Sequence, residues 1–343
     1  MRRLSTRPLT QSAGHVAVLG AGSWGTALGM LLCRNGHSVR LWGHEPEHMV
    51  QLAKEGENRQ FLPGFPLPPN LTPTANLGAA LDGARDLLVV VPSHAFATLL
   101  PQVADLLPAG IGVAWATKGF EPGTGRLLHQ VAAQALPGRD LAAISGPSFA
   151  REVAQGLPTA VTVASPQGLY AQRIADLLHG ERFRAYVNND IVGVQVGGGA
   201  KNVLAIAAGI ADGLGFGANT RAALITRGLA ELIRLGTALG GKPETFMGLA
   251  GLGDLVLTCT DDQSRNRRMG LALARGLDLG AAKAEIGQEV EGVITALAVH
   301  AISKAHGVEM PISEQVHAVL YRGVTPSEAT ATLLERSSKA EFY

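Results

Sequence analysis

The feature that most constrains the fold is the pattern G-x-G-x-x-G at residues 20–25. Residues 16–19 before it form an apolar run too short for a helix, and an Ala- and Leu-rich stretch of helical character follows. Strand, tight turn and helix in this order open a dinucleotide-binding fold. Gly20 permits the turn, Gly22 lets backbone approach a pyrophosphate, and Gly25 allows close packing of helix on strand. We therefore expect the free N–H groups of this helix to face the phosphates of a dinucleotide.

Length and charge limit the remaining options. A chain of 343 residues suggests two domains, because single cores rarely grow past roughly 250 to 300 residues. With 46% hydrophobic and 17% charged residues, the chain has the composition of a compact globular protein. Its 29 basic and 28 acidic residues leave a net charge of +1, so no overall basic field points to nucleic acid. Any anion site must therefore be local.

Cysteines and apolar runs indicate the cellular setting. Cys33 and Cys259 stand in apolar surroundings without metal-ligand spacing, so we expect two reduced packing thiols in a cytoplasmic protein, and no metal site. No window approaches the roughly 18 uninterrupted apolar residues of a membrane span, and the longest candidate run stops at Asp212. Residues 1–14 hold three arginines and no apolar stretch of signal-peptide length, and we interpret them as a loose extension.

The first half of the chain alternates short apolar runs with helical stretches. Three successive expected strands end in polar or glycine-containing loops, and in an open parallel sheet ligands bind outside those ends. We predict a Rossmann-type, doubly wound parallel sheet over residues 15–190. The segment 58–76 contains five prolines and should be an extended loop, a candidate cover for the ligand. After the first, the expected strands are 38–42, 86–91, 112–116, 141–144, 160–164 and 184–187.

From residue 191 the periodicity is helical, so residues 191–343 should form an all-helical domain. The apolar segment 192–213 contains Gly197, Gly198 and Gly199, and each glycine costs roughly 1 kcal/mol of helix stability relative to Ala. Three together suggest that another part of the protein, such as the dinucleotide domain, packs very close. Further helices are expected at 220–239, 266–275, 293–306 and 312–321.

The end of the second strand bears on the choice between NAD and NADP. A dinucleotide fold often places an acid there to bind the ribose hydroxyls. This chain has Gly43 and His44 at that point, with Glu45 one place later and Arg40 within the strand. A 2′-phosphate is then not repelled, and His44 could contact it, so NADPH is permitted. The alternative is that Arg40 and His44 are merely solvated.

Three charged residues stand in apolar or glycine-rich settings: Lys118, Lys201 and Asp254. Burial of a lone ionised group is very costly, so these residues should pair with one another or with a ligand. A desolvated lysine near a second ammonium has its pKa lowered toward neutrality and can exchange a proton at working pH. The alternative for Lys201 is an inert salt bridge to Asp254.

A second anion site is predicted at Ser264-Arg265-Asn266-Arg267-Arg268. Guanidinium binds phosphate through two parallel hydrogen bonds, and Asn and Ser donate more. Since the glycine turn already serves the dinucleotide, this second site implies a phosphorylated or acidic substrate. We assign the anion contact to Arg265 and place Arg267 and Arg268 on a solvated helix face.

Seven ordered motifs between about residue 16 and at least residue 291 closely resemble one family, the bacterial NAD(P)-dependent sn-glycerol-3-phosphate dehydrogenases. They read G-A-G-S-W-G-T-A-L, V-P-S-H-A, T-K-G-F-E, S-G-P-S-F-A-R-E-V, G-G-G-A-K-N-V-L-A-I, G-L-G-D-L-V-L-T-C-T and S-R-N-R-R. The resemblance implies reversible reduction of dihydroxyacetone phosphate to sn-glycerol 3-phosphate, which supplies phospholipid synthesis in the cytoplasm, with NAD or NADP as cofactor.

The resemblance also implies roles for individual residues. Lys201 is the proton donor or acceptor, with Lys118 and Asp254 beside it in the catalytic site. The implied substrate contacts are Lys118, Gly146, Ser148, Lys201, Asn202, Asp254, Ser264, Arg265 and Asn266. The implied cofactor contacts, besides the three glycines, are Ser23, Trp24, His44, Lys118, Ala150, Arg265 and Glu291. Glu289 departs from the family pattern, where an apolar residue is common.

Two alternatives stay open on the sequence alone. One is a dehydrogenase of similar two-domain build that acts on a phosphorylated sugar acid or a hydroxyacyl thioester. The other is a nucleotide-sensing module without chemistry, which would not need three charged residues in apolar contexts. The sequence does not fix the oligomeric state, with a homodimer as one option, nor the cofactor preference, nor any feedback regulation.

Overall fold

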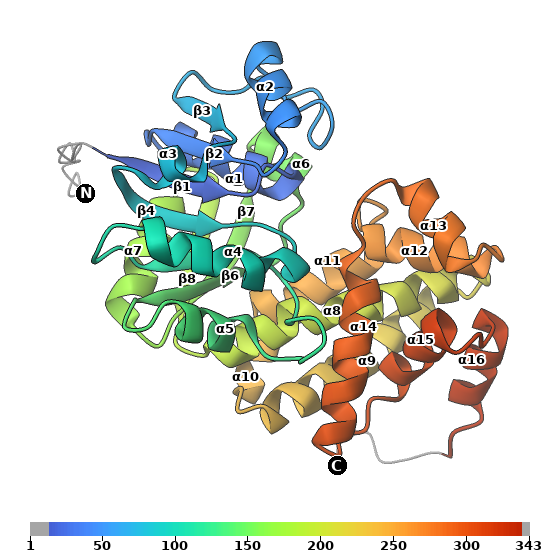
Figure 1. The fold of residues 1–343 in the computed structure, drawn as a ribbon. Helices are drawn as coiled ribbons and strands as arrows, with labels where there is room; N and C mark the ends of the chain where they lie inside the picture. Colours follow the sequence, from blue (N-terminus) through green and yellow to red (C-terminus); the bar gives the residue numbers. More distant parts are fainter. Residues whose placement is uncertain (1–13, 338–343) are drawn as a thin grey trace, which may run out of the picture.

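The computed structural model describes residues 14–337, which form an α/β domain followed by a helical domain (Figure 1). The last strand of the first domain ends at Asn188, and the long helix α8 (Ile191–Gly213) begins the second. Residues 1–13 of the predicted N-terminal extension lie outside the described part of the chain. The two-domain organisation agrees with the expectation from chain length, because single hydrophobic cores rarely serve chains of more than roughly 300 residues.

The first domain is built on an eight-stranded sheet of order β3-β2-β1-β4-β5-β6-β7-β8. Every neighbouring pair is parallel except β6 and β7, which are antiparallel. The order reverses between β1 and β4, and such a switch point opens a ligand crevice at the carboxyl ends of the strands. The predicted Rossmann-type fold is therefore confirmed. The strands are β1 (His15–Leu19), β2 (Val39–Trp42), β3 (Leu71–Thr74), β4 (Ala84–Val89), β5 (Val113–Trp115), β6 (Leu141–Ser145), β7 (Thr159–Ala164) and β8 (Phe183–Asn188).

Helices cover both faces of the sheet. Side chains of β1 alternate between two cores: Val16 and Val18 pack with α1 and α7, whereas Ala17 and Leu19 pack with α3, α4 and α5. This double burial explains why the strands read as continuous apolar runs. The helices of this domain are α1 (Ser23–Arg34), α2 (Pro46–Glu55), α3 (Leu77–Leu81), α4 (Ser93–Leu106), α5 (Leu128–Ala135), α6 (Ala150–Gln155) and α7 (Gly168–Leu178).

The proline-rich segment 58–76 is not a loop throughout. Its last part forms β3, which the sequence analysis missed. Pro73 lacks an N–H donor, but β3 lies at the edge of the sheet and pairs only with β2, so the strand tolerates it. The expectation of an extended, non-helical backbone was correct, and the expectation of no strand was wrong.

In the second domain, α8 is the central helix, and other helices pack around it (Figure 1). The predicted all-helical domain is confirmed, and the expected ranges match α9, α12, α14 and α15. Four short helices and a π-helical turn escaped prediction because their apolar periodicity is brief. The elements are α9 (Ala218–Ala238), α10 (Pro243–Phe246), η1 (Leu249–Gly253), α11 (Asp254–Thr260), α12 (Arg265–Ala274), α13 (Leu279–Ile286), α14 (Glu291–Ala305), α15 (Pro311–Tyr321) and α16 (Pro326–Leu334).

The glycines of α8 mark where neighbouring backbone comes close. A Cβ on Gly198 would lie 2.2 Å from Oγ of Ser145, and one on Gly199 would lie 3.1 Å from Cα of Gly119. Both neighbours belong to the α/β domain, as predicted. Gly197 instead packs against the π-helical turn of its own domain. Within residues 14–337, only α8 has the length and hydropathy of a membrane span, but 94% of its most apolar window is buried inside the protein.

Candidate active site

A cleft of about 780 Å³ runs along the carboxyl ends of the strands and between the two domains. Of the residues predicted to bind cofactor or substrate, all but Gly25 and Gly146 line it. The predicted residues at its walls are Gly20, Gly22, Ser23, Trp24, His44, Lys118, Ser148, Ala150, Lys201, Asn202, Asp254, Ser264, Arg265, Asn266 and Glu291. The structure thus brings both halves of the predicted site into one continuous space.

The three glycines of the first motif occupy three different environments. Gly20 has φ +123°, and a Cβ there would lie 2.6 Å from the carbonyl oxygen of Val90. A Cβ on Gly25 would lie 1.8 Å from the carbonyl oxygen of Gly20, so helix and strand pack at backbone contact. A Cβ on Gly22 would have nothing within 4 Å and would project into open space at the cleft. Gly22 therefore leaves the room that an incoming phosphate needs.

The N-terminus of α1 also fits a dinucleotide. Gly22 is the N-cap residue, and no side chain accepts a hydrogen bond there. The first-turn N–H groups of a helix are excellent anion donors when no side-chain cap satisfies them. Ser23 and Trp24, the next two residues, line the same part of the cleft. The residues present thus match the pyrophosphate of a nicotinamide dinucleotide.

At the other end of the cleft, one carboxylate holds two lysines. Nζ of Lys118 lies 2.6 Å from Oδ2 of Asp254, and Nζ of Lys201 lies 2.5 Å from Oδ1. The Asp254 side chain is 1% exposed and that of Lys201 is 6% exposed. Lys118 also donates to the carbonyl oxygen of Gly146. The expected pairing of these three charged residues is therefore present in the structure.

Each charged group comes from a different element. Lys118 follows β5, Lys201 lies in α8, and Asp254 is the first residue of α11, directly after the π-helical turn. Thr258, one turn along α11, accepts a hydrogen bond from Lys201 at 2.5 Å and donates its hydroxyl to the main-chain oxygen of Asp254. The sequence analysis did not single out Thr258. Its position four residues after Asp254 could have indicated it, because residues four apart lie on the same face of a helix.

Burial of the amine is the dominant influence on Lys201. It lowers the pKa of Lys201 from 10.5 to about 8, because the charged form loses solvation. The Asp254 carboxylate opposes this change, and the Lys118 ammonium adds to it. An amine with this pKa can give or take a proton near neutral pH. Besides its ion pair with Asp254, Lys201 lines the cleft.

The residues predicted as a second anion site lie at the start of α12. The Ser264 hydroxyl caps α12 by accepting from N–H of Arg267, and Arg265 is the next residue. Burial lowers the pKa of Arg265, and the Glu291 carboxylate opposes the change. The amide of Asn266 donates to Oδ1 of Asn202 and accepts from N–H of Gly292. Arg265 therefore offers the clearest charge for a ligand, while Asn266 also ties three elements together.

Two further predicted residues lie where the domains meet. Glu291 accepts hydrogen bonds from N–H and Oγ of Ser93, the first residue of α4. Burial raises the pKa of Glu291, and the Ser93 hydrogen bonds oppose this rise. On the facing loop, Ser148 donates to the carbonyl oxygen of Gly146. The Gly146 carbonyl thus joins the loop to Lys118, although Gly146 itself does not line the cleft.

On the side of the cleft expected to hold adenosine, His44 and Arg40 lie in different surroundings. The His44 side chain is 80% exposed at the rim, and its Nε2 lies 3.5 Å from Oε1 of Glu45, the acid that follows it in the sequence. Arg40 points elsewhere and donates to the carbonyl oxygens of Ala79 and Asp82. Arg40 is partly exposed and does not line the cleft. His48 and Phe61, which were not singled out, also line this side.

The prediction that Arg267 and Arg268 lie on a solvated face was wrong. The Arg267 side chain is 10% exposed, pairs with Asp212 at 2.6 Å and with Asp262, and donates to the main-chain oxygen of Cys259. Arg268 is half-buried and lines the cleft. Because α12 packs on α8 on one side and borders the cleft on another, it has little free surface in this turn.

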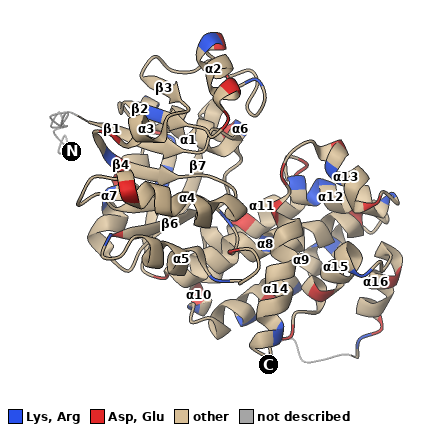
Figure 2. Ribbon diagram, in the orientation of Figure 1, with Lys and Arg blue, Asp and Glu red and all other residues tan. Residues whose placement is uncertain are grey.

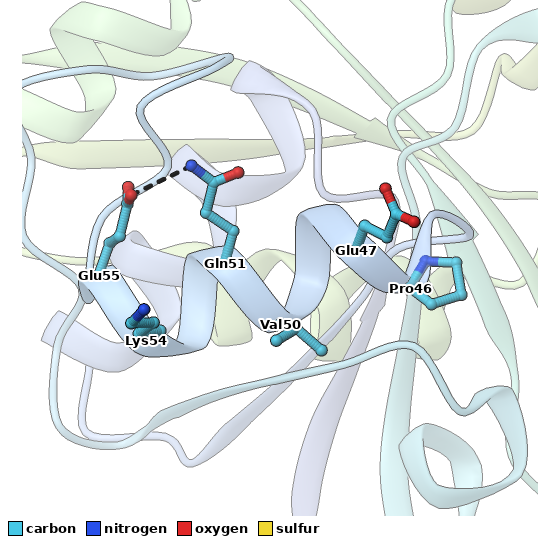
Figure 3. A pocket seen from close by; sticks show the side chains of 6 residues that line it. All are labelled: Pro46, Glu47, Val50, Gln51, Lys54 and Glu55. Carbon is cyan, nitrogen blue, oxygen red and sulfur yellow. Dashed lines mark hydrogen bonds between the residues drawn. The ribbon is translucent and has the colours of Figure 1, made fainter.

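A second hollow, the distribution of surface charge and the two cysteines are further candidates for a site. A hollow on the outer surface is lined by six residues of α2 alone, among them Val50, Gln51 and Glu55, with a hydrogen bond between the last two (Figure 3). Charged segments of both signs are interspersed over the two domains (Figure 2). Cys33 and Cys259 are both buried and free, and burial raises the pKa of each thiol to about 12.

Comparison with known proteins identifies the family. Residues 15–171 match the model of the NAD-dependent glycerol-3-phosphate dehydrogenase N-terminus, and residues 190–331 match that of the C-terminus. The chain belongs to the NAD-dependent glycerol-3-phosphate dehydrogenase family. The predicted family, the enzyme class and the use of a nicotinamide dinucleotide are therefore confirmed, and the two alternatives are set aside.

Individual relatives agree over nearly the whole length. The chain is 60% identical over 330 residues to a glycerol-3-phosphate dehydrogenase [NAD(P)+] of Thioalkalivibrio sulfidiphilus, covering 95% of this chain and 98% of that protein. It is 55% identical over 336 residues to one of Stenotrophomonas maltophilia, covering 97% and 98%. The crystal structure of glycerol-3-phosphate dehydrogenase from Coxiella burnetii matches with a TM-score of 0.92 at 50% identity, covering 95% of this chain and 100% of that one.

Proposed function

We propose that this glycerol-3-phosphate dehydrogenase reversibly reduces dihydroxyacetone phosphate to sn-glycerol 3-phosphate, with Lys201 as the group that transfers the proton. The α/β domain holds most of the dinucleotide, and the helical domain holds the phosphate of the substrate. In the cell the enzyme acts in the cytoplasm and supplies glycerol 3-phosphate for phospholipid synthesis. The observation that carries this proposal is a buried amine with a pKa of about 8 in the cleft that the glycine turn opens.

The bound nicotinamide supplies the hydride in reduction and takes it in oxidation. In reduction, Lys201 donates its proton to the C2 oxygen of the substrate, where negative charge develops. Lys118 lies on the other side of the shared Asp254 carboxylate and stabilises the same charge. Hydrogen bonds to Asp254 and Thr258 hold the Lys201 amine in a fixed orientation before the substrate binds.

The phosphate of the substrate binds at the start of α12. Arg265 supplies the charge, Ser264 can donate its hydroxyl while it caps the helix, and Asn266 fixes Asn202 at the wall. Binding energy from this remote group aligns the carbonyl with Lys201, which raises the rate and not only the affinity. A phosphorylated substrate is thus part of the mechanism.

The test is to follow the absorbance of NADH and NADPH, in separate titrations, with dihydroxyacetone phosphate. We expect oxidation of at least one cofactor. Dihydroxyacetone without the phosphate is the matched control, and its kcat/KM should be far lower because Arg265 has no partner. Failure to oxidise either cofactor, or equal kcat/KM for both ketones, would overturn the proposal.

A further inference from the structure

Asn58 is a buried polar side chain beside the glycine turn, although it does not itself line the cleft. It is 1% exposed and lies between α2 and β3. Its Nδ2 donates to the carbonyl oxygen of Ala21 and to Oγ1 of Thr26, both at 2.8 Å. Its Oδ1 accepts from N–H of Phe61 at 3.3 Å and lies 3.1 Å from Nε2 of His48. Both hydrogens and the oxygen of the amide are therefore used.

The two donated hydrogen bonds act on the phosphate-binding turn. Ala21 stands between the first two glycines of the motif, and Thr26 lies in the first turn of α1. The C=O and N–H of a planar trans peptide point in opposite directions. When Asn58 holds the Ala21 carbonyl toward the protein interior, the N–H of Gly22 is aimed to the opposite side, where the cleft lies.

The accepted hydrogen bonds act on the facing wall. His48 and Phe61 both line the cleft on the side of the β2 end, and their rings meet edge-on with centroids 5.1 Å apart and an interplanar angle of 88°. The oxygen of Asn58 holds the backbone of Phe61 and the ring of His48. A single buried amide thus links the turn that faces the phosphates with the aromatic wall opposite.

We propose that Asn58 is a positioning residue for the dinucleotide, which sets the spacing between the glycine turn and the His48–Phe61 wall without touching the ligand. The inference rests on the proposed binding of the cofactor at the glycine turn. It adds a specific requirement, since replacing the amide should weaken cofactor binding and leave the recognition of substrate phosphate unchanged.

Asn70 provides a matched control within the same proline-rich segment. Its Nδ2 also donates two hydrogen bonds, to the carbonyl oxygens of Cys33 and His37 at 3.2 and 2.7 Å. These acceptors lie at the far end of α1, away from the glycine turn. Asn58→Ala and Asn70→Ala therefore remove similar anchors of one segment, but only the first removes an anchor of the phosphate-binding turn.

The experiment measures the Kd of NADPH by fluorescence titration, the KM of dihydroxyacetone phosphate and the Tm of both variants. We expect the Kd of Asn58→Ala to rise about tenfold, the factor that one lost hydrogen bond of ordinary strength produces. Its KM for dihydroxyacetone phosphate should stay at the wild-type value. In Asn70→Ala the Tm should fall by a similar amount, while the Kd of NADPH stays unchanged.

An unchanged Kd in folded Asn58→Ala would overturn the inference, as would an equal loss of affinity in both variants. If Asn58→Ala does not fold, Thr26→Val removes one acceptor of the amide and keeps the side-chain shape. It should then weaken NADPH binding selectively, and an unchanged Kd there would equally overturn the inference. Absence of NADPH and NADH binding by the wild-type protein would instead refute the proposed function.

Discussion

Replacement of Lys201 by methionine tests the central chemical claim. Methionine keeps much of the length and volume of the lysine chain and removes the amine, so the buried space in α8 stays filled. Lys201 touches Asp254 and Thr258 in the helical domain, whereas the glycine turn lies in the other domain. Proton transfer should therefore be lost while the dinucleotide still binds.

The expected rate effect follows from the role of the amine. General acid–base catalysis typically contributes about 10²- to 10⁴-fold, which corresponds to about 3 to 5 kcal/mol of activation free energy. We expect kcat for dihydroxyacetone phosphate reduction to fall by this factor in Lys201→Met. The Kd of NADPH should stay at the wild-type value.

The expected effect on stability is small because two contributions oppose each other. The difference between a pKa of 10.5 and one of about 8 means that the protonated Lys201 amine costs about 3 kcal/mol in the folded state. Methionine removes this cost, but it also removes the hydrogen bonds of the amine to Asp254 and Thr258, which together contribute about 2 to 4 kcal/mol, while Asp254 keeps Lys118 as a partner. The free energy of unfolding should change by no more than about 2 kcal/mol.

The pH dependence of stability tests the lowered pKa of Lys201 independently of the kinetics. The unfolded chain keeps the Lys201 proton up to pH 10.5, whereas the folded protein releases it near pH 8. The cost is therefore fully present below about pH 8 and disappears as the pH rises toward 10.5. Over this window the wild-type protein should gain stability relative to Lys201→Met.

The assays are steady-state kinetics, NADPH titration and urea unfolding at several pH values, with Lys304→Met as the control. Lys304 is 62% exposed and pairs on the surface with Glu314, so its loss should leave kcat unchanged. If Lys201→Met keeps more than about a tenth of the wild-type kcat, the reasoning is refuted, because a proton-transfer group typically contributes about 10²-fold or more. Loss of NADPH binding together with kcat would refute the division of labour between the domains.

Two further predictions concern the same cleft. The rate of reduction should decline above about pH 8 as Lys201 loses its proton. Asp254 raises the pKa of Lys201 and Lys118 lowers it, so Asp254→Asn should move the decline to lower pH and Lys118→Met to higher pH. If both variants shifted the profile of kcat against pH in the same direction, the assignment would be contradicted. Gly22→Ala should keep the wild-type Tm and weaken NADPH binding, because its methyl group would have nothing within 4 Å in the protein. Gly25→Ala should lose about 3 kcal/mol or more of stability, because its methyl group would lie 1.8 Å from a backbone oxygen. Equal Tm values for the two variants would show that the motif is not packed as described.

Local patterns were sufficient for the elements that carry the dinucleotide site. The positive φ of Gly20 and the backbone contact of Gly25 are consequences of a turn between a strand and a helix, and such a turn is encoded in a few adjacent residues. Short elements without a clear period, such as β3 and the π-helical turn before Asp254, were not predicted. Their conformation depends on partners from distant parts of the chain.

Exposure could not be predicted for the arginines of α12. A Cβ on Gly270 would lie 2.1 Å from the carbonyl oxygen of Ile206, so α12 meets α8 at backbone distance. This close contact turns Arg267 inward to Asp212, which lies 55 positions away in the sequence. A run of arginines reads as a solvated face unless the packing of the two helices is known.

The sequence by itself determined the glycine turn between a strand and a helix, and that Lys118, Lys201 and Asp254 need partners, because an unpaired buried charge is too costly. It did not determine the pairing. Only the tertiary structure placed one carboxylate between two lysines that lie 136 and 53 positions from it in the chain. The reason is physical: desolvation makes a partner necessary wherever a charge is buried, but the arrangement of the strands and helices decides which partner is within reach.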